Sequence, residues 1–319
     1  MSAAQPVEIS IVLPVFDEED NLATLHNELS EVMGSIGRSY EIIFVDDGST
    51  DGSFDRLSEI QRQDSTVIVV RFRRNFGQTA AMVAGFDIAS GEIIVTLDAD
   101  GQNDPQDIPR LLAKIDEGYD LVSGWRYERQ DKLLLRRVPS GLANRLISYT
   151  TDVKLHDYGC TLKAFQRDVI KNIRLYGEMH RFIPAIASWG GVRIGEIQVN
   201  HRARVKGQSK YGISRTSRVI LDLITVKFLL SYSSRPLQFF GPFGLLFGGI
   251  GVLLSVYLAV QRIFFGVPLA DRPILLLAVL LIFSGLQIIT VGLLAEMQTR
   301  TYHEAQDKPI YVIREILRG

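Results

Sequence analysis

The sequence is poor in cysteine and in net charge, and both shortages exclude classes of protein. Cys160 is the only cysteine among 319 residues, so the chain cannot form an internal disulfide or a cysteine-rich metal site. The 35 lysines and arginines balance 36 aspartates and glutamates, so the overall charge does not favour binding to nucleic acid. Residues 1–8 have neither a basic segment nor a long apolar run, so we expect no signal peptide and a globular part in the cytosol.

Charged residues are also missing from two long stretches near the C-terminus. Residues 236–261 and 273–295 contain none, and each stretch exceeds the roughly 20 residues that cross a bilayer. We expect a hairpin of two transmembrane helices over 236–300, although a pair of buried core helices is the alternative. Arg235 and Arg300 flank the hairpin, and the positive-inside rule modestly favours a cytosolic location for both termini.

The first two thirds of the chain alternate short apolar runs with helical segments. Five runs are expected to be strands, at 9–15, 42–45, 67–70, 93–97 and 119–123. Apolar strands separated by helices predict an α/β domain over 1–212, with a parallel sheet and helices on both faces. In such sheets, ligands bind beyond the carboxyl ends of the strands.

Two carboxylates and an amide follow the fourth run. Asp98, Asp100 and Gln102 offer the oxygen ligands that Mg²⁺ or Mn²⁺ prefers, and such ions take a few protein carboxylates together with substrate phosphates. A cation there would act as a Lewis acid on a diphosphate leaving group. A solvated acidic turn is the simpler alternative for an Asp-x-Asp taken by itself.

A second acid pair follows the second run. Asp46 and Asp47 cannot point into an apolar core without a large cost in free energy, so they either bind a base or ribose or cap the next helix. We expect Asp46 and Asp47 to bind ligand, and Ser49, Thr50 or Asp51 to cap the helix.

A third motif, Pro14-Val15-Phe16-Asp17-Glu18-Glu19, follows the first run. Together, the three strand ends resemble the family 2 glycosyltransferases with the GT-A fold, whose pattern combines P-V-Y-N-E, D-D-G-S and D-x-D motifs. Phe16 and Asp17 replace the usual Tyr and Asn. The resemblance implies a Rossmann-like domain that binds a nucleotide sugar.

Further motifs resemble the polyprenyl-phosphate glycosyltransferases, which include dolichyl-phosphate mannose synthases and bactoprenol glucosyltransferases. The similarity covers about 9–212 and includes 124–126, 156–160, 177–184 and 204–211. The two-helix tail resembles the bacterial glucosyltransferase branch in particular. The resemblance therefore implies inverting transfer of a sugar, with UDP-glucose as the expected donor, to a lipid such as undecaprenyl phosphate. Mannose from GDP-mannose and other UDP-sugars are alternatives.

The resemblance also implies roles for individual residues. The positions that match nucleotide-sugar contacts are Pro14, Phe16, Glu18, Asp46, Asp47, Asp98, Arg126 and Lys210. Asp98, Asp100 and Gln102 match the metal and diphosphate site, and Arg136, Ser140 and Arg204 match positions beside the acceptor phosphate. Asp157 and Asp100 are the expected catalytic carboxylates. Arginine offers bidentate geometry to a phosphate, which favours this role, and a surface charge is the alternative for each of these basic residues.

The role of Asp157 is open between two readings. A phosphomonoester has a second pKa of ~6 and is largely deprotonated already, so Asp157 is expected to orient the attacking oxygen rather than to take its proton. His156 is the alternative base. Glu178, His180 and Arg181 either hold sugar hydroxyls or brace their own loop.

Two amphipathic segments, 136–150 and 213–235, are expected to hold the head against the membrane, and 301–319 to form a cytosolic tail. A homo-oligomer packed through the tail helices is a further expectation. The rival functions are a processive polysaccharide synthase and an inactive lipid-binding scaffold. The sequence lacks the Q-x-x-R-W motif of the synthases, and the presence of Asp98, Asp100 and Asp157 argues against a scaffold.

Overall fold

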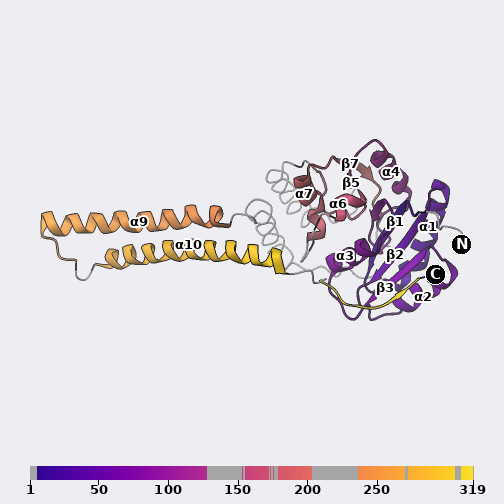
Figure 1. Cartoon of the computed structure of the whole chain (residues 1–319), viewed down its shortest axis with the longest axis horizontal. Helices are drawn as coiled ribbons and strands as arrows, with labels where there is room; N and C mark the ends of the chain where they lie inside the picture. The colour runs from indigo at the N-terminus through magenta and orange to yellow at the C-terminus, as the bar shows by residue number, and fades with distance from the viewer. Residues whose placement is uncertain are drawn as a thin grey trace. The chain divides into compact units, whose positions relative to one another are not determined.

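The computed structural model describes residues 6–127, most of 153–175, 179–202, 236–269, 272–305 and 310–318 (Figure 1). It divides into two compact units, Met1–Leu223 with Pro309–Gly319 and Ile224–Lys308. The expected acceptor-phosphate residues Arg136, Ser140 and Arg204, the expected donor residue Lys210 and both amphipathic segments lie outside the described residues, so these assignments stay predictions.

One eight-stranded sheet organises the first unit, in the order β7-β5-β6-β4-β1-β2-β3-β8. The strands are β1 (Ile9–Val15), β2 (Tyr40–Asp46), β3 (Val67–Phe72), β4 (Ile93–Thr96), β5 (Leu121–Arg126), β6 (Lys163–Gln166), β7 (Ile194–Val199) and β8 (Ile313–Leu317). β1 to β4 pair in parallel, at the apolar runs that predicted them. β6 is antiparallel to β4 and β5, and β8 is antiparallel to β3, so the sheet is mixed rather than wholly parallel.

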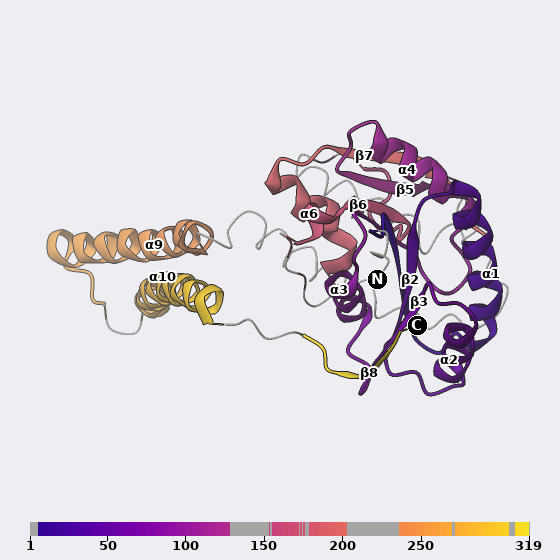
Figure 2. The same cartoon turned by 45° about the vertical axis from the view of Figure 1, so that its right-hand side comes forward.

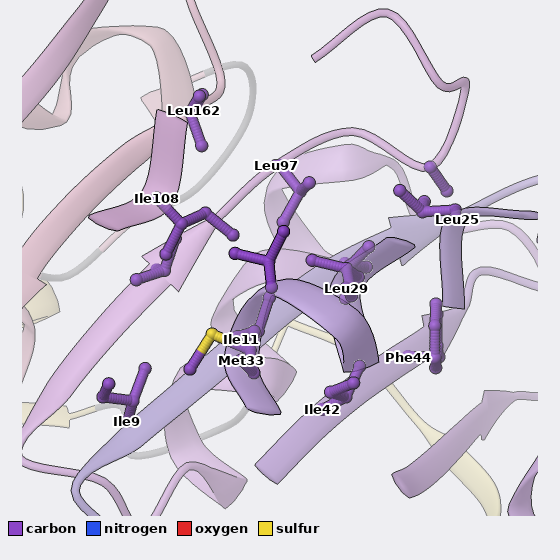
Figure 3. Packing of buried hydrophobic residues seen from close by; sticks show 14 of the residues in the cluster. Ile9, Ile11, Leu25, Leu29, Met33, Ile42, Phe44, Leu97, Ile108 and Leu162 are labelled. Carbon is purple, nitrogen blue, oxygen red and sulfur yellow. The ribbon is translucent and has the colours of Figure 1, made fainter. Parts of the chain in front are cut away.

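Helices cover both faces of this sheet (Figure 2). The apolar residues of α1 (Glu19–Ile36) recur every three or four positions, from Leu22 to Met33, and form one buried stripe. This stripe packs with α2 (Ser53–Gln63), α4 (Ile108–Asp116) and the side chains that β1 and β2 present to the same face. Figure 3 shows part of this core, including Met33 of α1, Ile108 of α4 and Ile11 of β1. On the opposite face, α3 (Gln78–Ile88) approaches β1 so closely that a Cβ at Gly85 would lie 2.2 Å from a methyl of Val12.

Short helical turns complete the unit, one before α4 and the others after β6. They are η1 (Pro105–Asp107), which precedes α4, then α6 (Arg167–Lys171), η2 (Met179–Phe182), α7 (Ile183–Ala187) and η3 (Ser188–Gly190). The region between β6 and β7 therefore has no long helix among the residues described.

The second unit contains the two charge-free stretches. They form α9 (Pro236–Phe265) and α10 (Pro273–Ala305), and both are long and apolar enough to cross a membrane. Only 17% and 11% of their most apolar segments are buried, unlike the core helices of a soluble domain. Glycines allow the two helices to pack closely, since a Cβ at Gly285 would lie 2.5 Å from the carbonyl oxygen of Gly244. The predicted α/β sheet domain followed by an apolar helical hairpin is observed.

The C-terminal segment returns to the first unit. β8 pairs with β3 over Val69 to Phe72, and the Arg73 backbone N–H donates to the Val312 carbonyl at 3.1 Å. The sequence analysis treated 301–319 as a tail and did not predict this strand. Segments on both sides of the hairpin in the sequence thus share one sheet.

Candidate active site

A cavity of about 220 Å³ lies at the carboxyl ends of β1, β2 and β4. Its lining residues are Pro14, Val15, Phe16, Glu18, Asp47, Asn75, Gly77, Gln78, Asp98, Ala99 and Asp100. The structure therefore brings together six of the predicted site residues from three separate strand ends. Asn75, Gly77 and Gln78 were not predicted, although they follow β3 and obey the same strand-end rule.

Asp98 is held by two neutral side chains. Gln78 Nε2 donates to Oδ1 at 2.7 Å, and Thr161 Oγ1 donates to Oδ2 at 2.7 Å. Asn103 Nδ2 in turn donates to Thr161 Oγ1 at 3.0 Å. Burial, followed by the negative charge of Asp100, raises the pKa of Asp98 to about 6. Local donors thus fix the orientation of this carboxylate without neutralising it.

Asp100 lies in a tight turn with Gln102. Its Oδ1 accepts the backbone N–H of Gln102 at 3.1 Å, and Gly101 between them has φ 72°, which favours glycine. The Gln102 carbonyl accepts the backbone N–H of Arg202 at 2.9 Å. These contacts hold the Asp-x-Asp segment in a fixed conformation beside the cavity.

The two carboxylates suit a divalent cation that takes its other ligands from a substrate. Among the described residues, no group of three His, Cys, Asp or Glu side chains is placed to hold a metal ion. The pKa of Asp98 is raised chiefly by burial and further by the negative charge of Asp100. Two carboxylates with phosphate oxygens and water match the coordination that Mg²⁺ and Mn²⁺ adopt with nucleotides.

Asp47 organises the loop that follows β3. Its Oδ1 accepts the Phe76 N–H at 2.6 Å and its Oδ2 accepts the Gly77 N–H at 2.9 Å. Gly77 has φ 98°, a conformation that most side chains disfavour. Burial raises the pKa of Asp47 to about 6, although these two hydrogen bonds oppose the shift. Asp47 thus lines the cavity and also fixes its neighbouring wall.

Asp46 lies behind the cavity rather than in its lining. Its side chain is fully buried, and its Oδ1 accepts the Ser49 N–H at 3.0 Å. Its Oδ2 accepts no hydrogen bond among the described residues, and Arg71 Nε lies 3.8 Å away. Burial raises the pKa of Asp46. Asp51 Oδ1 accepts the Ser53 N–H at 3.0 Å, but the N-cap of α2 is Gly52, so the predicted N-cap at Ser49, Thr50 or Asp51 is wrong.

Arg126 and Asp157 form a bidentate, largely buried ion pair. Arg126 Nε donates to Oδ2 at 2.6 Å and Nη2 donates to Oδ1 at 3.0 Å, and the side chains are 14% and 6% exposed. Burial by itself would lower the pKa of Arg126, but the hydrogen bond and charge of Asp157 raise it. Protonation of Asp157 would remove the charge that pairs with Arg126. The geometry therefore favours a role for Asp157 in orienting the attacking oxygen rather than in taking its proton.

The neighbouring His156 has partners of its own. Its Nδ1 lies 2.7 Å from Glu196 Oε2, and its ring stacks on Trp125 with centroids 4.1 Å apart. A buried contact of 2.7 Å likewise joins His180 Nδ1 to Thr79 Oγ1 of α3, which favours a bracing role for His180. Glu178 lies outside the described residues.

Lys163 is a buried cation that the sequence analysis did not identify. It is 2% exposed, and its ammonium group donates to the carbonyl of Cys160. Burial lowers its pKa. Lys163 pairs with Thr96 of β4 and Ser123 of β5 in the sheet register, so it lies between the strands that carry Asp98 and Arg126. No local sequence pattern marks such a residue.

With this fold and site, the chain belongs to glycosyltransferase family 2. Residues 10–174 match the family described as Glycosyl transferase family 2. A full-length relative, the dodecaprenyl-phosphate galacturonate synthase of Rhizobium johnstonii, is 46% identical over 98% of this chain and 94% of its own length. The prediction that the protein is a family 2 glycosyltransferase is therefore confirmed.

Other similar proteins agree on the family and fold. The undecaprenyl-phosphate 4-deoxy-4-formamido-L-arabinose transferase of Klebsiella pneumoniae is 39% identical over 98% of this chain and 94% of its own length. Among solved structures, glucosyl-3-phosphoglycerate synthase of Mycobacterium tuberculosis, in complex with Mn²⁺ and UDP-glucose, aligns with a TM-score of 0.54. That alignment covers 69% of this chain and 79% of the other at 20% identity, so it supports the fold alone.

Proposed function

We propose that this glycosyltransferase moves a sugar from a nucleotide carrier to a polyprenyl phosphate in a membrane. The observation that carries the proposal is the cavity in which Asp98 and Asp100 face the Asp47 loop. Two relatives that match nearly the whole chain are named for polyprenyl-phosphate products or acceptors. The apolar helices α9 and α10 agree with an acceptor that stays in the membrane.

In the proposed reaction, an oxygen of the lipid phosphate attacks C1 of the sugar. The bond between C1 and the diphosphate oxygen breaks, and its electron pair leaves with the nucleoside diphosphate, which inverts the configuration. The acceptor oxygen needs no strong base because the phosphate is already ionised at neutral pH. Asp157, held by Arg126, would orient that oxygen.

Asp98 and Asp100 would hold a divalent cation, Mg²⁺ or Mn²⁺, which when bound supplies Lewis-acid stabilisation of the diphosphate. Pro14, Phe16, Glu18 and Asp47 would contact the nucleotide, since they line the same cavity. Arg136, Ser140 and Arg204 remain the proposed residues for the acceptor phosphate, and Lys210 for the donor.

The sugar is the least constrained part of the proposal. The relatives described above are named for galacturonate and for 4-deoxy-4-formamido-L-arabinose, so they do not support the expected UDP-glucose. We infer that nucleotide-linked galacturonic acid is the first donor to test, because the galacturonate synthase is the more similar of the two.

A cytosolic location for the catalytic unit and both termini remains our proposal for the topology. The arrangement of β8 supports only the common side in this proposal, because strands before and after the hairpin pair in one sheet and must therefore lie on one side of the membrane. A homo-oligomer remains a prediction.

Product analysis tests the function. The full-length protein is incubated with undecaprenyl phosphate and, separately, UDP-galacturonic acid, UDP-4-deoxy-4-formamido-L-arabinose, UDP-glucose and GDP-mannose, with Mn²⁺, Mg²⁺ or EDTA. We expect mass spectrometry to detect a lipid-phosphate sugar from UDP-galacturonic acid, and its loss with EDTA or with Asp100→Asn. A product from UDP-glucose alone would refute the galacturonate inference, and no product from any donor would refute the function.

A further inference from the structure

The C-terminal segment 311–317 lies at the edge of the sheet, separated by β3 from the end of β2 that carries Asp46 and Asp47. The β2–β3 register pairs Asp46 with Arg71, and the β3–β8 register pairs Arg71 with Glu315. Three charged residues of alternating sign therefore lie side by side across three adjacent strands. Figure 2 shows β8 at this edge of the sheet.

Arg71 connects the two carboxylates. Its Nη1 lies 3.3 Å from Glu315 Oε1, and its Nε lies 3.8 Å from the buried Oδ2 of Asp46. Because no donor among the described residues hydrogen-bonds that oxygen, Arg71 supplies the positive charge nearest to it. A buried carboxylate is costly without such a partner, and Glu315 holds the arginine in place.

The orientation of Asp46 bears on the cavity through the loop after β2. Asp46 Oδ1 accepts the Ser49 N–H at 3.0 Å, and Ser49 Oγ accepts the Asp17 N–H at 3.0 Å. Asp17 lies between Phe16 and Glu18, which line the cavity, and it has an unusual φ of 51°. A continuous series of ionic and hydrogen-bonded contacts therefore connects Glu315 of β8 with the cavity-lining segment around Asp17.

A second set of contacts is aromatic. Tyr311 stacks on Phe72 with centroids 5.2 Å apart and planes 10° from parallel, and its hydroxyl donates to Asp87 at 2.7 Å. Phe72 meets Phe76 edge to face at 5.7 Å. The Phe76 N–H donates to Asp47, so this chain of rings ends at the other acid of the pair.

We propose that the segment 311–317 is a positioning element of the donor pocket, in which Glu315 acts through Arg71 on Asp46 and Tyr311 acts through Phe72 and Phe76 on Asp47. The inference rests on the proposed function, since it takes the cavity as the site of the nucleotide sugar. The segment that follows the membrane hairpin thus completes the nucleotide-binding part of the catalytic unit, while the contacts to Asp98 come from elsewhere.

Nucleotide binding by the full-length protein tests the proposal. Calorimetric titration with UDP and with GDP, each with Mn²⁺, compares the wild type with Glu315→Gln and Tyr311→Ala. We expect the dissociation constant of the bound nucleotide to rise roughly three- to tenfold in each variant, the effect of losing one modest interaction. Glu59→Gln breaks an exposed ion pair with Arg56, and Tyr311→Phe keeps the stacked ring, so both controls should bind nucleotide like the wild type.

An exchange of charges separates positioning from simple stability. Combining Arg71→Glu with Glu315→Arg restores an ion pair between β3 and β8 but places a negative charge beside Asp46. We expect the exchange to regain only part of the Tm lost by Glu315→Arg, because the carboxylate introduced at position 71 repels Asp46, while nucleotide affinity stays roughly tenfold or more below that of the wild type.

Two results would overturn the inference by itself: wild-type nucleotide affinity in both Glu315→Gln and Tyr311→Ala, or recovery of both Tm and affinity in the exchange. A wild-type protein that binds neither UDP nor GDP would instead overturn the proposed function, and this inference with it.

Discussion

The acid pair after β2 and the acid pair after β4 look alike in sequence but differ in how the protein balances their charge. Each pair follows a buried strand, and each contains one carboxyl group whose pKa burial raises to about 6, Asp47 and Asp98. Asp47 accepts two backbone N–H groups and Asp46 faces the guanidinium of Arg71. Asp98 is bonded by neutral side chains, and the charge of Asp100 raises its pKa further.

This difference separates a structural from a chemical role. The pair after β2 uses its oxygens to fix the loops around the cavity. The pair after β4 lines the cavity, where its carboxylates would hold the proposed divalent cation beside a diphosphate. Under the proposed function, the same strand-end signature serves loop positioning after β2 and metal binding after β4.

The largest expected effect is on turnover, at the pair after β4. Asp98→Asn and Asp100→Asn each remove a proposed cation ligand, so we expect kcat to fall roughly 100- to 1,000-fold. The melting temperature should change little in Asp100→Asn but fall slightly in Asp98→Asn, because an amide oxygen can accept only one of the two hydrogen bonds that Gln78 and Thr161 donate to Asp98. Steady-state assays of lipid product, with thermal melts of the same samples, check both expectations. A variant with wild-type kcat would remove that residue from the metal site.

The next largest expected effect is on stability, at Asp157, whose negative charge is paired with the Arg126 guanidinium. Asp157→Ala leaves the Arg126 guanidinium buried without its bidentate partner, which we expect to cost about 3 kcal/mol of unfolding free energy. Chemical denaturation of the full-length protein measures this loss. Arg126→Met combined with Asp157→Ala should recover part of the loss, and a double variant no more stable than Asp157→Ala would contradict the pairing account.

The pH dependence of Mn²⁺ affinity tests whether Asp98, in the pair after β4, is a cation ligand. Below about pH 6, Asp98 holds a proton that a cation must displace, so affinity for Mn²⁺ should fall as the pH drops and be constant above the pKa. We expect close to a tenfold loss per unit below that pKa, about the limit for one proton. Titrations of Mn²⁺ between pH 5 and 8 test this, and Asp98→Asn should bind weakly at every pH.

The smallest expected effect is at Asp47. Asp47→Asn keeps the size of the side chain but can accept only one of the two N–H groups that Phe76 and Gly77 donate. We expect a loss of about 1 kcal/mol in stability and a several-fold higher KM for the nucleotide sugar, with kcat nearly unchanged. A kcat loss as large as that of Asp100→Asn would contradict the division of roles.

The sequence was sufficient to predict the part of the site that depends on strand direction. Parallel strands bring their carboxyl ends to one edge, so Pro14, Asp47 and Asp98 could be grouped from three separate motifs. The apolar runs located β1 to β5 because buried parallel strands are apolar on both faces. Charge-free length in the same way located α9 and α10.

The remaining parts depend on contacts between distant segments. Thr161 reaches Asp98 only because β6 inserts antiparallel between β4 and β5. β8 is a short strand whose apolar residues alternate with polar ones, which is a weak sequence signal. Its partner β3 lies more than 200 residues earlier in the sequence, so the sequence pattern does not reveal their pairing. Asp46 and Asp47 are adjacent and chemically identical, so only the structure shows that one is buried behind the cavity and the other lines it.

Electron paramagnetic resonance of Mn²⁺ tests the central comparison most directly, because it counts bound cation in the presence of saturating UDP. The account predicts stoichiometric Mn²⁺ in the wild type and in Asp47→Asn, and no bound Mn²⁺ when Asp98→Asn and Asp100→Asn are combined. Bound Mn²⁺ in that double variant, or its loss in Asp47→Asn at saturating UDP, would contradict the assignment of metal binding to the acid pair after β4.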